Sequence, residues 1–141
     1  MLALIVLIIK LIIGGAISYI LPSVSKQDIS ESNHLKIACI GILSTAMFSV
    51  SIQLDSTSPY ILSTGSMILI GILSYSLSNK MEDVEKILFY CSAVIGLFIG
   101  VGYILQGIIL SFLVYYITNN QSDLFSIIKN RDETLDNNDN N

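Results

Sequence analysis

The sequence is poor in charged residues. Only 13% of its 141 residues are charged, whereas soluble domains carry roughly 25%. Long uncharged runs recur along the chain, and they lack the apolar–polar alternation of β-barrel strands. Because lipid cannot satisfy free backbone donors and acceptors, the runs are expected to be helices. The fold class predicted is therefore all-α, a polytopic transmembrane helical bundle.

The sequence also has few residues of the kinds that carry chemistry. It contains one histidine, His34, expected to be solvated in or beside a loop, and two cysteines, Cys39 and Cys91, inside apolar runs. Patterns such as HExxH, CxxC, GxSxG and the phosphate loop are absent. We therefore expect no enzyme and no catalytic, cofactor or metal site. A net charge of −4 without a basic patch excludes nucleic acid as an expected partner.

The longest uncharged run, residues 87–117, sets the number of membrane passages. As one helix it would be roughly 46 Å long, against about 30 Å for the hydrocarbon core. With two passages, all the basic residues that lie outside the spans fall on one side of the membrane. With one passage, four of them fall on one side and two on the other. These basic residues are Lys26, Lys36, Lys80, Lys86, Lys129 and Arg131. The positive-inside rule favours two passages.

This interpretation predicts five spans, with the N-terminus outside and the tail in the cytoplasm. A single passage would also leave Tyr103 at mid-membrane, whereas tyrosine prefers the interface. The last two spans are expected to be joined by a tight glycine-rich hairpin. The first run is interpreted as a retained span, because nothing basic precedes Lys10 and Pro22 follows directly. The predicted spans are 1–21, 35–54, 60–77, 84–100 and 103–118, forming a domain over 1–118, followed by a polar, mostly disordered tail over 119–141.

Lys10 is the one charge well inside a predicted span. A centred lysine costs roughly 2.5–3.5 kcal/mol of insertion free energy, which the surrounding Leu, Ile and Val residues offset. Two interpretations stay open. Lys10 either faces a polar interior or pathway, or it is a snorkelling or structurally paired lysine.

Small residues recur at four-residue spacing, which places them on one helix face and allows close helix approach. Examples are Gly14 with Ser18, Gly41 with Thr45 and Ser49, Gly96 with Gly100, and Gly107 with Ser111. Tight packing within the bundle is the main interpretation, and self-association is the alternative.

The order of these segments resembles the membrane domain of the MgtC/SapB family. "LSTGSMILIGIL", residues 62–73, is similar to the start of that family's third span, and "SAVIGLFIGVGY", residues 92–103, to its fourth. "HLKIACIGILSTAMF" is similar to the second span with its preceding basic residue. We expect a divergent member that lacks most of the charged signature and the C-terminal soluble domain. The candidates for helix packing or a partner interface are Gly14, Ser63, Gly65, Gly71, Gly96, Gly100 and Gly102.

The resemblance implies a regulatory role in the plasma (inner) membrane. The regulated machinery would be the ATP synthase or ion homeostasis linked to Mg²⁺, reached through helix–helix association. Expected partners are membrane lipid and another integral membrane protein or a second copy of the chain. The alternative function is a transporter or channel component in which Lys10 lines a polar path.

Overall fold

The computed structural model describes residues 2–25, 29–54 and 61–120, and these residues are all-helical, as predicted. The predicted turn over 55–59 and the tail beyond Asn120 lie outside the described residues. Of the helices, α1 to α4 are long and apolar enough to cross a membrane, whereas α5 is shorter. They are α1 (Leu2–Ser23), α2 (Glu31–Leu54), α3 (Ile61–Ser78), α4 (Asp83–Val101) and α5 (Ile104–Asn119).

Each helix overlaps the corresponding predicted range, with differences at the ends. Helix α1 continues through Pro22, which lies in its last turn, and α2 begins at Glu31, inside the polar segment between the first two apolar runs. Proline has no N–H to donate to the carbonyl four residues earlier, and α1 ends one residue after Pro22, at Ser23. The helices therefore extend a few residues beyond the apolar runs that predicted them.

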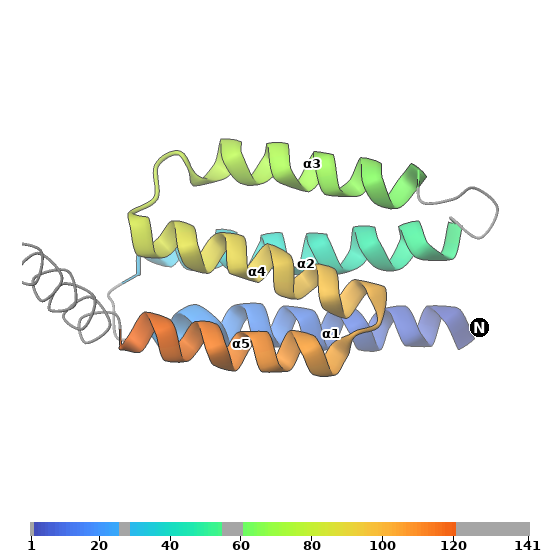
Figure 1. Cartoon of the computed structure of the whole chain (residues 1–141), viewed down its shortest axis with the longest axis horizontal. Helices are drawn as coiled ribbons and strands as arrows, with labels where there is room; N and C mark the ends of the chain where they lie inside the picture. The colour runs from blue at the N-terminus through green and yellow to red at the C-terminus, as the bar shows by residue number, and fades with distance from the viewer. Residues whose placement is uncertain (1, 26–28, 55–60, 121–141) are drawn as a thin grey trace, which may run out of the picture.

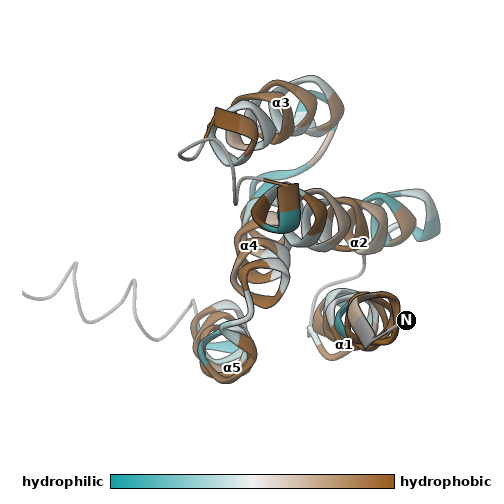
Figure 2. Cartoon of the chain, turned by 90° about the vertical axis from the view of Figure 1, so that its right-hand side faces the viewer, coloured by the Kyte–Doolittle hydropathy of each residue, from teal (hydrophilic) through white to brown (hydrophobic). Residues whose placement is uncertain are grey.

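The helices lie nearly parallel to one long axis and form three layers (Figure 1). Helices α2 and α4 form the middle layer, α3 lies on one side of it, and α1 and α5 lie on the other (Figures 1 and 2). The end of α1, the start of α2, the end of α3, the start of α4 and the end of α5 share one end of the bundle. The connection between α4 and α5 stops short of the opposite end, where α1 begins.

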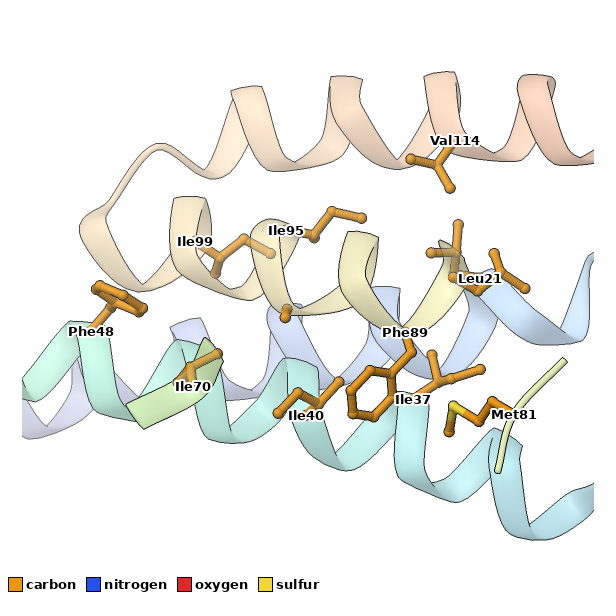
Figure 3. Close-up of a cluster of buried hydrophobic side chains, with 12 residues drawn as sticks. Leu21, Ile37, Ile40, Phe48, Ile70, Met81, Phe89, Ile95, Ile99 and Val114 are labelled. Carbon is orange, nitrogen blue, oxygen red and sulfur yellow. The ribbon is translucent and has the colours of Figure 1, made fainter. Parts of the chain in front are cut away.

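The apolar core lies between α2 and α4. The rings and branches of Phe89, Ile37 and Ile40 fill the space between these two helices, while Ile95 and Ile99 of α4 extend toward α5 (Figure 3). All five side chains are almost fully buried. Helix α4 is therefore the central element, which contacts every other helix.

The outer faces of the helices are apolar. Large side chains such as Ile12, Ile61, Ile72, Leu105 and Phe112 are more than 60% exposed. A soluble monomer rarely exposes a contiguous apolar surface of this extent, whereas lipid covers such a surface without cost. The exposed faces and the four long apolar helices together are typical of a multi-pass membrane protein.

Candidate helix interfaces within the membrane

Small residues bring α1, α2 and α4 into close contact. A Cβ atom added at Gly96 would lie 2.9 Å from Ser44 Cβ, and one added at Gly100 would lie 2.7 Å from the Thr45 carbonyl oxygen. A Cβ at Gly41 would meet Ser18 Cβ at 2.6 Å and Ser92 Oγ at 2.7 Å. These positions leave no room for a methyl group. We call this contact the three-helix core.

Two other small residues with four-residue spacing, the candidate Gly14 and Gly107, differ in their surroundings. Gly14 belongs to the three-helix core, because a Cβ there would lie 3.2 Å from Thr45 Cβ. Gly107, on α5, packs on α4, since its Cβ would lie 2.9 Å from Ile99 Cγ1. Among the small residues at four-residue spacing, some would therefore place a Cβ against the backbone of a neighbouring helix, and others only against its side chains.

Cross-helix hydrogen bonds hold the three-helix core together. Ser44 Oγ of α2 donates to the Ala93 carbonyl oxygen of α4 at 2.7 Å, and Ser92 Oγ of α4 donates to the Ile37 carbonyl oxygen of α2 at 2.8 Å. Both serines are fully buried. The sequence analysis did not single out either residue. The sequence signal that could have identified them is that both are polar residues within apolar runs.

Lys10 lies at the C-terminus of α4. Its ammonium donates to the Gly100 carbonyl oxygen at 2.9 Å, in a half-buried position. The last carbonyls of a helix lack intrahelical partners and carry partial negative charge, so a cation is favourable there. Lys10 follows the first residue of α1 by eight positions, a rise of about 12 Å, which places this contact well inside the N-terminal end of α1.

Gly102 terminates α4 beside Lys10. Its φ of +112° lies in the left-handed region, and its N–H donates to the carbonyls of Phe98 and Ile99 at 3.1 Å. A glycine at this position is common at helix ends because it has no Cβ to clash with the following carbonyl. Tyr103, which begins the next helix, is 56% exposed.

The opposite end of the bundle contains a charged group that the sequence analysis did not identify. The Glu85 carboxylate is only 7% exposed, and one of its oxygens accepts from Asn33 Nδ2 at 2.7 Å and from the Glu82 N–H at 3.0 Å. Lys36 in turn donates to Asn33 Oδ1 at 2.9 Å. The N-terminus of α4 carries partial positive charge, which favours a carboxylate there. The hydrogen bonds of Glu85 and Asn33 connect this end of α4 to the start of α2.

His34 is not a free loop residue, contrary to the expectation. It lies in the first turn of α2, where its Nε2 is 2.8 Å from Ser23 Oγ and its ring packs edge-on against Tyr19. The Ser23 hydroxyl also donates to the Tyr19 carbonyl oxygen at 3.0 Å, one turn earlier in α1. These contacts connect the end of α1 to the start of α2. Among the described residues, His, Cys, Asp and Glu form no group able to hold a metal ion.

Helix α3 contributes little of its surface to the bundle. Its buried residues, Ser66, Ile70, Ser74 and Ser78, occur every fourth position and form one narrow stripe. Gly65 and Gly71 have no neighbouring atom within 4 Å of an added Cβ, so neither packs closely against another of the helices that the structure describes. Ser63 is half-buried and lies on the same face of α3 as this stripe. That Gly65 and Gly71 form a partner interface therefore stays a prediction.

A groove of about 220 Å³ runs between α3 and α4, which we call the α3–α4 groove. Ser74 lines it and is 3% exposed, yet its Oγ has no hydrogen-bond partner among the described residues. An unpaired buried hydroxyl costs roughly 1–3 kcal/mol, so a partner group in the groove would stabilise it. The lining residues are Ser44, Phe48, Met67, Ile70, Gly71, Ser74, Tyr90, Ala93, Val94 and Leu97.

No protein-family model matches the chain, and no curated protein or solved structure is significantly similar to it.

Proposed function

We propose that this protein is a non-enzymatic membrane protein that binds another integral membrane protein through the α3–α4 groove and so regulates it. The observation that carries the proposal is Ser74, a buried hydroxyl without a partner, beside Gly71, whose face is open. A transmembrane helix lying over this groove would approach closely at Gly71, and an acceptor side chain inserted from it would reach Ser74 after the buried hydroxyl rotates toward the groove. Small residues and interhelical hydrogen bonds are the main sources of helix association in lipid.

The spacing of the residues on both walls supports a helix as the occupant. On α3, Met67, Gly71 and Ser74 follow the three-and-four spacing of a helix seam, and on α4, Tyr90, Val94 and Leu97 do the same. Two parallel seams of this kind form the holes into which side chains of a third helix insert. The volume of about 220 Å³ fits inserted side chains, with the partner helix outside the groove.

We further propose five passages, with the N-terminus outside and the tail in the cytoplasm. The start of α2, the α3–α4 connection and the start of α4 lie at one end of the bundle, and with them Lys36, Lys80 and Lys86, which supports this orientation. Helix α5 returns from Gly102 to that end, so the last two spans would be joined by a tight glycine-rich hairpin. Reporter fusions at Asn120 and Ser56 are expected on opposite sides of the membrane; the same side for both would contradict five passages.

The identity of the partner is the part of the proposal that depends on the MgtC/SapB resemblance. If the resemblance reflects common descent, the partner belongs to the ATP synthase or to ion homeostasis linked to Mg²⁺, in the plasma membrane. A transport role with Lys10 lining a polar path has less support. The Lys10 ammonium is bonded to Gly100, and the contacts at Gly41, Gly96 and Gly100 are too close for a water-filled passage.

Photo-crosslinking in native membranes tests the binding proposal. A photoreactive amino acid at Met67, on the groove, is expected to give a discrete adduct with one integral membrane protein. The same group at Leu105, which is 67% exposed on α5, is expected to give lipid adducts only. An adduct of twice the mass of the chain would identify a second copy as the partner. Lipid adducts alone from both positions would refute the proposed function.

A further inference from the structure

The connection between α4 and α5 lies part-way along the bundle, short of the end at which α1 begins (Figure 1). It joins Val101 to Ile104 beside α1, where a Cβ added at Gly102 would lie 3.8 Å from Lys10 Nζ. From the depth and the polar groups of this connection we infer that water enters the membrane here, from the side on which α1 begins, and that this access ends at Lys10. The inference is independent of the proposed partner site on α3.

Hydrocarbon extends beyond the connection because the start of α1 is apolar. The segment 2–9 contains no polar residue, and its Leu4 and Ile5 side chains are exposed, so they require surrounding lipid. The contact between Lys10 and Gly100 lies about 12 Å along α1 from its first residue. The length of α5 agrees, since 16 residues rise about 24 Å and the hydrocarbon core is about 30 Å thick. The connection therefore lies within the membrane and not at its surface.

The connection carries polar groups that hydrocarbon cannot satisfy. The first intrahelical hydrogen bond of α5 runs from the Gly107 N–H to the Tyr103 carbonyl oxygen, and no side chain caps the helix. The N–H groups of residues 104–106 precede this bond and have no partner within the helix. The Gln106 side chain adds an exposed amide, and Tyr103 is 56% exposed. Non-helical backbone occurs at membrane depth only where protein or water covers it.

Lys10 favours water as the cover. Its ammonium has three N–H donors, and among the described residues one of them donates to the Gly100 carbonyl oxygen. Water supplies acceptors for the others, and charges inside spans commonly face water-filled space. On the far side of Lys10 the bundle is closed, because the contacts of Gly96 and Gly100 with α2 leave no room for a methyl group. Water therefore reaches Lys10 from one side of the membrane only.

Hydrogen–deuterium exchange of the unaltered chain in phosphatidylcholine nanodiscs tests the access of water. The N–H groups of residues 104–106 are expected to exchange as fast as those of residues 83–84, which precede the first intrahelical bond of α4 at the polar end of the bundle. They are expected to exchange at least about tenfold faster than those of residues 110–116. Exchange as slow as that of residues 110–116 would show a dry connection and overturn the inference. This measurement needs no substitution, so it does not depend on whether a variant folds.

Cysteine labelling in sealed membranes tests the side from which water enters. The background chain carries Cys39→Ala and Cys91→Ala, which removes both native thiols. In it, Gln106→Cys is expected to react with a membrane-impermeant maleimide added on the side where α1 begins, and not with the same reagent on the opposite side. Ile5→Cys and Phe112→Cys are the matched controls, because both positions are exposed and lie in hydrocarbon. They are expected to react at least about tenfold more slowly, since a thiol in apolar surroundings seldom ionises.

Three labelling results would contradict the inference. Reaction of Ile5→Cys as fast as Gln106→Cys would show that the start of α1 lies in water and not in hydrocarbon. Reaction of Gln106→Cys from both sides would show a continuous passage through the bundle. Reaction of Gln106→Cys only after detergent is added would show that lipid, a second copy or another protein covers the connection in place of water.

Discussion

The three-helix core and helix α3 are built from the same kinds of residue, but they pack in opposite ways. Gly41, Gly96 and Gly100 meet neighbouring backbone or Cβ atoms at distances that exclude a methyl group, whereas Gly65 and Gly71 of α3 meet nothing. Ser44 and Ser92 donate across helices in the core, whereas the hydroxyl of Ser74 on α3, like those of Ser18 and Ser49 in the core, has no partner among the described residues. Small residues in a membrane helix therefore show where a close approach is possible, and the fold decides whether this chain makes it.

The comparison predicts its largest effect in the three-helix core. Replacing Gly96 with Leu forces α2 and α4 apart, because Ser44 Cβ would lie 2.9 Å from the new Cβ. The expected loss of unfolding free energy is about 3 kcal/mol, the upper end of typical overpacking. Thermal melting in mild detergent measures it, with Phe112→Leu, 69% exposed on α5, as the control. Melting of both variants within a degree or so of wild type would show that this face is not packed.

A smaller loss is expected when the Lys10 ammonium is removed. Lys10→Met leaves the Gly100 carbonyl without its donor, and a hydrogen bond from a charged group contributes about 1.5–3 kcal/mol. Reversible unfolding in mixed micelles measures the change. Lys86→Met is the control, because its ion pair with Asp83 at 3.3 Å is largely exposed and contributes at most about 1 kcal/mol. If the two variants are equally stable, Lys10 does not hold the end of α4.

The next effect concerns the backbone at Gly102. Its φ of +112° is unfavourable for a residue with a Cβ, so Gly102→Ala is expected to cost about 1–2 kcal/mol. The same unfolding assay applies. Gly65→Ala is the matched control because its site is helical and open. A neutral Gly102→Ala would mean that the connection between α4 and α5 has a different conformation.

The smallest effect is expected on the outer face of α3. Gly65→Leu adds a side chain where no atom lies within 4 Å, so the stability of the isolated chain is expected to change by less than about 0.5 kcal/mol. Melting of the purified protein, without a partner, is the appropriate measurement. A loss comparable with that of Gly96→Leu would remove the distinction between the two regions.

Much of the helical architecture follows from the sequence, because the length of an apolar run and the absence of charge determine where a helix can lie in lipid. Each of the five apolar ranges overlaps one helix of the structure, and α4 ends at Val101, within the uncharged run 87–117. The helix ends were less predictable, since polar residues such as Glu31 and Asn33 continue α2 beyond its apolar run. The start of α2 has a local cap, because the Asn33 N–H donates to Ser30 Oγ at 3.3 Å, whereas the bond from Asn33 to Glu85 of α4 is a contact that no local pattern reveals.

The candidate sites were predictable only in part, because four-residue spacing identifies a helix face without identifying its neighbour. The spacing applied equally to Gly96 with Gly100, which contact α2, and to Gly107, which contacts Ile99. Lys10 was identified from its charge, but its contact with Gly100 joins residues 90 positions apart. Ser74 could not be distinguished from other serines, since its unpaired hydroxyl is a property of the packed bundle.

The most direct test measures two properties of two glycine variants in the same membranes. The properties are thermal stability of the purified chain and yield of the photo-crosslinked partner from Met67. The account predicts that Gly96→Leu lowers the melting temperature, whereas Gly71→Leu leaves melting unchanged and abolishes the partner adduct, because its side chain occupies the α3–α4 groove. A Gly71→Leu variant that retains the adduct at wild-type yield, or that melts like Gly96→Leu, would contradict the claim that α3 presents an open docking face.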